Sequence, residues 1–335
     1  MDWFRLDKAR QKTILEQTSA KTGIPVFAVE KDIWVSILLK AVFSLPYANQ
    51  LIFKGGTSLS KGWDLIKWFS EDIDISISRE HLGFTGDLSN EKIDQLRKEV
   101  YKFCHGKFLE DVSTAMEKLK VPSNLYSIEP IIKEVRKGPA GNMINYQSVL
   151  DKSNEYVQPR VLLELSGRSQ KEPKENMVMN TIVSEQYPNI SQADINSEVP
   201  TIIPQRTFLE KLFLLHEEFT KPIEKINANR RSRHLYDVVE IHKKYGKGLW
   251  DETLFNDIRQ YRQKYTPILT TDYDDLTMAN ISFIPDGDAL EIFEADYKVV
   301  KENMIYGDGT LEWVELIKYL QKTKDEMVSY KKITN

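Results

Sequence analysis

The chain has 335 residues, of which 41% are hydrophobic and 29% charged, with 15 Gly and 13 Pro. This is ordinary globular usage, and it excludes a disordered or collagen-like chain. A single cysteine, Cys104, excludes an intramolecular disulfide and a thiolate metal cage. Residues 1–30 lack the order of a signal peptide, and no apolar run reaches the ~20 residues of a membrane span. We therefore expect a cytoplasmic protein with no membrane segment.

Helices are predicted up to Leu45, because apolar residues recur every three to four positions between Val29 and Ala41. A short apolar run at 51–53 then leads into a Gly-Gly turn, and a helix is predicted from Ser58 to Phe69. Isoleucine alternates with Asp or Ser from 73 to 78, which is typical of a half-buried strand. The predicted order is strand, Gly turn, helix, strand.

A long amphipathic helix packed on the sheet is predicted from Glu91 to Leu119. Turn residues separate four further predicted strands: 126–135, 143–149, 160–166 and 177–183. A polar, Pro-bearing segment from 187 to 204 predicts a junction, after which helices dominate. We expect an α+β fold, with a mixed-sheet domain and N-terminal helices over residues 1–200 and a mainly helical domain over residues 201–335.

The first candidate motif is the run from Lys54 to Lys61, whose sequence is KGGTSLSK. A Gly55-Gly56 turn that leads into a helix lets backbone N–H groups, with the hydroxyls of Thr57 and Ser58, approach a phosphate. Lys61 is a further candidate for binding it. The alternative is a tight turn with no ligand, and the spacing of a P-loop is absent.

The second candidate motif is the Asp-x-Asp in the strand that follows. Asp72 and Asp74 share one face of that strand, ~6.5 Å apart, and two carboxylates there suit Mg²⁺, with Mn²⁺ as the alternative ion. A solvated strand face competes with this interpretation, but Asp is rare in strands and like charges on one face repel. Glu164 stands among apolar residues of a predicted central strand, so it is either structurally paired or a third metal ligand.

The segment from Lys221 to Lys247 holds eight Lys or Arg and three acids, a net charge of +5. Such a segment either binds phosphates or is a solvated helix face. The five histidines (His81, His105, His216, His234, His242) show no zinc spacing, and Cys104 lies on the apolar side of a predicted helix as a core thiol.

Several blocks of the sequence resemble the AbiEii/AbiGii-type toxin nucleotidyltransferases of the DNA polymerase β-like superfamily. Besides KGGTSLS at 54–60 and FSEDID at 69–74, they are EKDIWV at 30–35, PQRTFLEK at 204–211, LLHE at 214–217, SRHLYD at 232–237, ADY at 295–297 and MIYG at 304–307. The resemblance makes Lys211 and Asp237 the third and fourth elements of the site. From the residues alone, Lys211 extends along a core-facing helix towards solvent, and Asp237 pairs with Arg233.

The expected reaction is in-line attack of a hydroxyl on the α-phosphate of an NTP, with release of pyrophosphate, at metal held by the Asp pair. Lys211 would stabilise charge on the transferred group. The resemblance implies a toxin of an abortive-infection, phage-defence toxin–antitoxin system, with a tRNA 3′ end as acceptor and a cognate antitoxin as partner. Alternatives are nucleotidylation of a protein hydroxyl, metal-dependent glycosyl transfer and a nucleotide-binding module without turnover.

Overall fold

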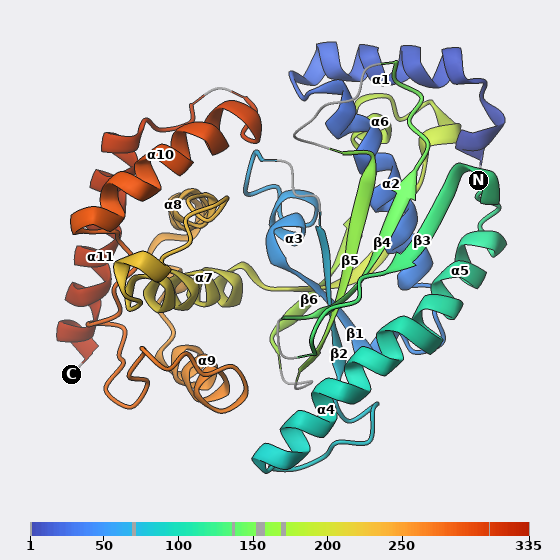
Figure 1. Cartoon of the computed structure of the whole chain (residues 1–335). Coiled ribbons are helices and arrows are strands. Elements are labelled where there is room, and N and C mark those ends of the chain that lie inside the picture. The colour runs from blue at the N-terminus through green and yellow to red at the C-terminus, as the bar shows by residue number, and fades with distance from the viewer. Residues whose placement is uncertain are drawn as a thin grey trace. The chain divides into compact units, whose positions relative to one another are not determined.

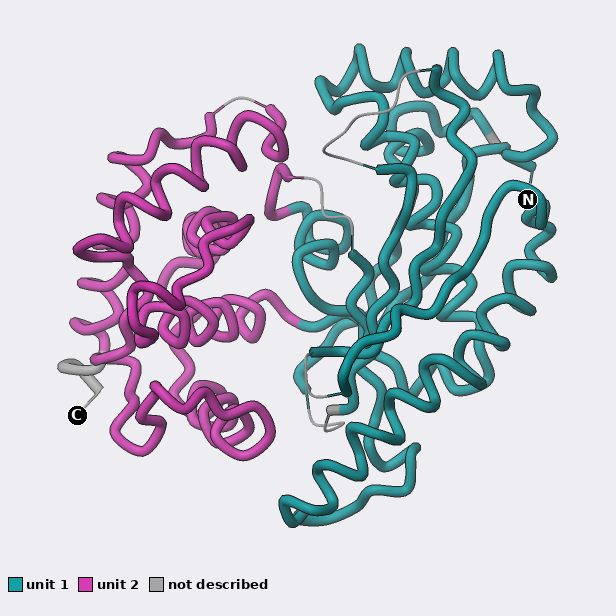
Figure 2. The backbone as a smooth tube through the Cα atoms, viewed as in Figure 1, with its two compact units in different colours: residues 1–64, 69–202 teal, residues 65–68, 203–335 magenta. Residues whose placement is uncertain are grey.

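The computed structural model describes residues 2–68, 72–135, 138–151, 158–168, 172–307 and 309–334. The chain divides into two compact units, one formed by residues 1–64 and 69–202 and the other by residues 65–68 and 203–335 (Figure 2). The four residues Leu65–Trp68 therefore belong to the second unit although they lie between parts of the first. Within the described ranges, no helix is both long and apolar enough to cross a bilayer.

The first unit is built on a seven-stranded sheet in the order β3-β4-β5-β2-β1-β7-β6 (Figure 1). The pairs β2/β5 and β1/β7 are parallel and the other pairs are antiparallel, so the predicted mixed sheet is confirmed. The strands are β1 Leu51–Lys54, β2 Asp72–Ser78, β3 Tyr126–Pro130, β4 Ala140–Tyr146, β5 Arg160–Arg168, β6 Lys174–Met179 and β7 Ser197–Ile202.

Helices cover the apolar face of this sheet, where Ile73, Ile75 and Ile77 are completely buried. Helices α2 and α4 pack against β5, and α5 packs against α2 (Figure 1). Almost all of α2 is buried, including the charged residues Glu30, Lys31 and Asp32 as well as its many apolar side chains. The helices of this unit are α1 Lys8–Thr22, α2 Val26–Val42, α3 Gly55–Lys61, α4 Asn90–Phe103, α5 Leu109–Lys118 and α6 Ile182–Gln186.

Two predicted helices differ from the observed ones. The helix predicted from Ser58 to Phe69 is α3, which begins at Gly55 and ends at Lys61, because the chain turns at Asp64 (φ 49°) and its next residues join the second unit. The long helix predicted from Glu91 to Leu119 is α4 and α5 joined by a π-helical turn, with non-helical backbone at Gly106 (φ −107°, ψ −106°).

Two predictions near the junction are right only in part: the boundary between the units, after residue 202, lies within 187–204, and the strand predicted at 177–183 overlaps β6. The strand predicted at 177–183 ends at Met179, because Thr181 caps α6 by accepting a hydrogen bond from the Ser184 N–H. The predicted junction at 187–204 contains β7. This strand includes Pro200, which lacks an N–H, and its parallel pairing with β1 is confined to Phe53 and Thr201.

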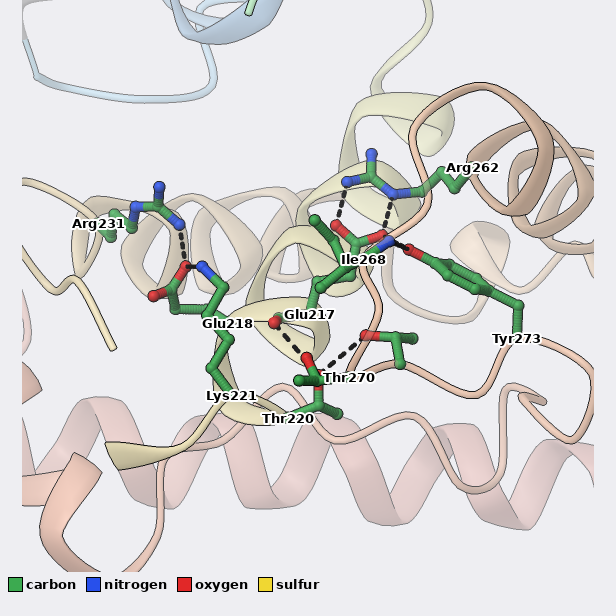
Figure 3. A network of polar contacts seen from close by, with 10 residues as sticks. Glu217, Glu218, Thr220, Lys221, Arg231, Arg262, Ile268, Thr270 and Tyr273 are labelled. Carbon is green, nitrogen blue, oxygen red and sulfur yellow. Dashed lines mark hydrogen bonds and ion pairs between the residues drawn. The ribbon is translucent and has the colours of Figure 1, made fainter. Parts of the chain in front are cut away.

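The second unit is mainly helical, as predicted, and Trp68 forms an isolated bridge with Ile305. Glu217 joins the end of α7 to α9 and to the loop that comes after it, because its carboxylate accepts hydrogen bonds from Arg262 and from the Tyr273 hydroxyl, the latter at 2.6 Å (Figure 3). The helices are α7 Pro204–Phe219, α8 Arg233–Tyr245, α9 Glu252–Tyr265, α10 Gly287–Asn303 and α11 Trp313–Thr334.

Buried acids on α2 hold the first unit together. Asp32 accepts hydrogen bonds from Lys61 Nζ (2.6 Å) and from the Ile182 N–H (2.7 Å), so it joins α2 to α3 and α6. The two charged side chains are only 8% and 7% exposed. Glu30 similarly accepts bonds from Ser148 Oγ (2.6 Å) and from the Val149 N–H (2.7 Å). The EKDIWV block therefore supplies structural contacts.

We predict that Asp32→Ala lowers the free energy of unfolding by about 3–5 kcal/mol, because it leaves the Lys61 ammonium buried without its counter-ion. The matched control is Asp94→Ala, which breaks an ion pair with Arg97 whose side chains are both 34% exposed, and should cost at most about 1 kcal/mol. Urea denaturation checks both values. Equal losses in the two variants would contradict the structural role of Asp32.

Candidate active site

The two motifs of the first unit meet on one face of the sheet. Strand register aligns Lys54 of β1, Asp74 of β2 and Glu164 of β5 as neighbours across three strands. Residues opposite one another in register project to the same face. Asp72 also projects to this face, two positions from Asp74, whereas the intervening Ile73 is fully buried on the other face.

Gly55 lies directly against Asp74. A Cβ atom at Gly55 would stand 2.1 Å from Asp74 Oδ2, and the Gly55 backbone has φ 79°, which L side chains rarely adopt. No other residue therefore fits at this position without displacing the carboxylate. The Gly turn and the second Asp of the D-x-D are held in contact although they lie on different elements.

The hydroxyls of the Gly turn make hydrogen bonds within the protein. Thr57 Oγ1 donates to the Asp72 carbonyl, and Ser58 Oγ donates to the Gly55 carbonyl at 2.8 Å. Both side chains are buried. Thr57 thus fixes the turn to β2 beside the D-x-D, while α3 begins at Gly55 with no side-chain cap. Lys61, the last residue of the motif, donates to Asp32 and to the Asn180 carbonyl at 2.6 Å.

The pKa of the Glu164 carboxyl group on this face is raised well above its ordinary value. Burial and the nearby Asp74 carboxylate raise the pKa of Glu164 to about 7, opposed by the positive charge of Lys133. Lys133 Nζ lies 3.6 Å from Glu164 Oε1. Both interpretations of Glu164 thus have a physical basis. Structural pairing is supported by its cationic partner, and metal binding is supported by the acids around it. Lys133 was missed, because only the β3–β4 pairing brings residues 131–135 to β5.

The donor set of this face fits a magnesium ion. Mg²⁺ is usually bound by one or two carboxylates together with substrate phosphates and water, and Asp72 and Asp74 supply two such groups. A cation between them would also offset the repulsion that raises the pKa of Glu164. In the part of the chain that the structure describes, no group of three or more His, Cys, Asp or Glu side chains is arranged to hold a metal. Metal binding by Glu164 therefore stays a prediction.

The second unit contains the other two predicted residues, and it brings them together. Lys211 of α7 and Asp237 of α8 form an ion pair of 2.5 Å, with side chains 6% and 0% exposed. The alternative of a lysine that extends into solvent was wrong, because the ammonium is buried. The alternative partner for Asp237 was also wrong, since Arg233 instead lies over the Trp68 ring, 4.7 Å from its centroid.

Two residues that sequence reasoning missed complete this pair. Trp68 Nε1 donates to Asp237 Oδ1 at 2.6 Å, and His234 Nδ1 lies 3.3 Å from Lys211 Nζ. Burial and the Lys211 charge lower the pKa of His234, so the ring is neutral and its Nδ1 can accept from the ammonium. The pair is thus fixed by hydrogen bonds at both ends.

Trp68 reaches Asp237 because Leu65–Trp68 is bound to the second unit. The Lys67 N–H donates to Tyr236 Oη at 3.1 Å, and the Lys67 carbonyl accepts from the Tyr306 N–H at 2.8 Å. These contacts give the SRHLYD and MIYG blocks a structural role. Phe69, Ser70 and Glu71, the start of the FSEDID block, lie outside the described residues.

A comparison with protein families identifies the chain as a nucleotidyltransferase. The chain matches the family described as nucleotidyl transferase AbiEii toxin, type IV TA system, over residues 37–319. This match covers most of the chain, which therefore belongs to the AbiEii family of nucleotidyltransferase toxins. The resemblance drawn from the sequence blocks is confirmed.

Among solved structures, the chain is similar to MenT4, the nucleotidyltransferase toxin Rv2826c from Mycobacterium tuberculosis H37Rv. The identity is 14% and the TM-score 0.43, over 97% of this chain and 99% of that chain. No curated protein sequence matches significantly. The functional conclusions for this chain rest on its family membership and on the contacts between its own residues.

Gly55→Ala tests the contact between the turn and the carboxylate. We expect a larger loss of unfolding free energy than for Gly83→Ala, because both positions have positive φ (79° and 86°) but only Gly55 meets another group within 4 Å. The shared backbone strain is worth about 1–2 kcal/mol, and the clash with Asp74 adds to it. Chemical denaturation measures both. Equal losses would show that Asp74 moves aside without cost.

Proposed function

We propose that this protein transfers a nucleoside monophosphate from an NTP to the 3′ hydroxyl of an RNA, with tRNA as the expected acceptor, and releases pyrophosphate. Family membership supplies the class of reaction and the toxin role in a type IV toxin–antitoxin system. The observation that carries the proposal is the contact of Gly55 with Asp74, which puts a phosphate-accommodating turn against a candidate metal ligand. The first unit would be the nucleotidyltransferase domain, and the second would contribute Lys211 and Asp237.

In this proposal Asp72 and Asp74 hold Mg²⁺, or Mn²⁺ in its place, and Glu164 is the candidate third ligand. The ion would neutralise phosphate charge and activate the attacking hydroxyl. Gly56 would let the triphosphate approach the backbone because it has no side chain, whereas Gly55 makes room for the Asp74 carboxylate beside the turn. Thr57 and Ser58 would act through the shape of the turn, because their hydroxyls donate to carbonyls.

Lys211 would stabilise the charge that develops on the transferred phosphoryl group. Asp237 would orient the ammonium as its buried counter-ion, and Trp68 and the neutral His234 fix the two groups. We assign Trp68 and His234 as positioning residues. Lys61 would have a structural role, because its ammonium donates hydrogen bonds to Asp32 and to a backbone carbonyl.

We further propose a cognate antitoxin as partner, phage defence as the setting and the cytoplasm as the location. A reducing compartment is consistent with Cys104, a buried thiol whose pKa burial raises to about 12, so that it stays protonated and unreactive.

The proposal predicts that Asp74→Asn abolishes transfer, with a loss of at least about 100-fold, because it removes a metal-binding charge at nearly constant shape. The assay incubates the full chain with Mg²⁺, each α-labelled NTP in turn and total RNA, then separates RNA from protein. Asp94→Asn, on the surface of α4, is the control that keeps activity. Undiminished labelling in Asp74→Asn contradicts the proposal, and label on protein alone would identify a protein acceptor instead.

Trp68→Phe should lower kcat about tenfold with little change in the KM for NTP, because it removes the hydrogen bond to buried Asp237 and keeps an aromatic ring. Trp63→Phe is the matched control, since Trp63 Nε1 donates to the Ile202 carbonyl at 3.0 Å within the first unit. Steady-state kinetics of labelled product separate the two. Equal kcat values for the two variants would show that Trp68 has no role in the site.

A further inference from the structure

A cavity lined by arginines lies at the start of α8, and no step of the proposed reaction uses it. Its volume is about 390 Å³, within the ~300–1,000 Å³ range of ligand sites. Arg230, Arg231 and Arg233 line it, together with the side-chain amides of Asn227 and Asn229. Guanidinium groups bind phosphate oxygens in a fixed, bidentate geometry.

The cavity accounts for only one part of the basic segment identified in the sequence. The arginines stand before and at the first residue of α8, whereas Lys243 and Lys244 stand near its end, about 15 Å further along the helix axis. The basic residues therefore form two groups and not one face. The arginine group shares the cavity with His234, whose ring contacts Lys211.

The loop that carries the arginines is held in a set conformation. Arg230 has φ 58°, a left-handed backbone that arginine rarely adopts. Asp296 of α10 supports it by accepting hydrogen bonds from the Arg230 N–H (2.8 Å), the Ser232 N–H (3.0 Å) and the Ser232 hydroxyl (2.5 Å). Backbone strain maintained by a network of hydrogen bonds is typical of functional sites. This gives the ADY block a role in presenting the arginines.

The charge of the cavity suits one phosphodiester better than a triphosphate. Glu218 is the one carboxylate among the lining residues, and it binds Arg231 and, at 2.6 Å, Lys221 (Figure 3). Its second oxygen accepts the Asn227 N–H at 2.7 Å. The lining residues therefore sum to a formal charge of about +2, which is enough to neutralise the single negative charge of a phosphodiester but not the charge of a triphosphate.

The cavity also has apolar walls. Leu214, Leu215 and Phe293 line it, and Leu214 is 37% exposed. A ribose or an unstacked base can pack on such residues and on guanidinium planes, as in recognition of single-stranded RNA. Amide side chains such as Asn227 and Asn229 can hydrogen-bond the edge of a base.

We propose that this cavity binds one phosphodiester-linked nucleotide of the single-stranded end of the RNA acceptor. The inference rests on the proposed function for the identity of the RNA as substrate, but binding is measured without turnover. It assigns the arginines to the acceptor and leaves the NTP to the Gly turn, the Asp pair and Lys211.

The test compares two double variants of the full chain, Arg230→Gln/Arg231→Gln and the control Lys243→Gln/Lys244→Gln, which removes the same charge from the far end of α8. Fluorescence anisotropy measures binding of a labelled single-stranded RNA over a salt series. We expect the arginine variant to bind at least tenfold more weakly, and its slope of log K against log salt to be smaller by about 0.7 for each phosphate that it no longer binds. The control and NTP binding should stay near wild type.

Arg231→Lys keeps the charge opposite Glu218 but loses the bidentate geometry, so its affinity should fall less than that of the arginine double variant. Thermal unfolding shows whether each variant is folded. Unchanged RNA binding in the arginine variant, equal loss in the lysine control, or loss of NTP binding in place of RNA binding overturns the inference. So does absence of RNA binding by the wild-type chain. If RNA binds through the arginines but no label is transferred, the proposed function fails and the cavity assignment stands.

Discussion

The close approach of a glycine backbone to a carboxylate is the constraint on which the first unit's site depends. Gly55 stands where a Cβ would overlap Asp74, and the neighbouring Thr57 is bonded to the backbone of Asp72. The sheet register then places Glu164 next to Asp74. Crowding of acids is unfavourable in the absence of a cation, and in the proposed function a divalent ion bound by the two aspartates would offset this repulsion.

The second unit contains buried charges of both signs. It buries a lysine and an aspartate together, and such a pair is stable only where further hydrogen bonds satisfy both groups. Trp68 supplies one of these bonds from a segment that precedes the D-x-D strand in the chain. Burial and the ion pair restrict the position of the Lys211 ammonium, as its proposed role in stabilising the transferred group would require.

The local features of the site could be predicted from sequence, because they depend on short-range periodicity. Alternation in Ile73–Ser78 places the two aspartates on one face, and consecutive glycines predict the turn. The pairing of Lys211 with Asp237 was expected only from the family resemblance, since no local pattern joins two helices. Mg²⁺ binding, the NTP and the RNA acceptor stay predictions.

Other features could not be predicted because distant contacts override local preference. Trp63 and Ile66 continue the apolar spacing of a helix, yet the helix ends at Lys61. The segment Leu65–Trp68 instead forms hydrogen bonds with residues near Tyr306. The helix predicted from 91 to 119 is interrupted at Gly106. β7 was not predicted from the sequence because it contains Pro200. Lys133 and His234 acquire partners only through tertiary packing.

The insertion of Leu65–Trp68 also limits how this protein can be divided. The backbone passes between the two units after residues 64, 68 and 202, so a single cut between residues 202 and 203 leaves both pieces incomplete. The C-terminal piece would lack the indole that caps Asp237, and the N-terminal piece would keep a tetrapeptide without the residues that bind it. Recombination that exchanges one unit between relatives must therefore carry the tetrapeptide with it, which ties the inheritance of the two halves together.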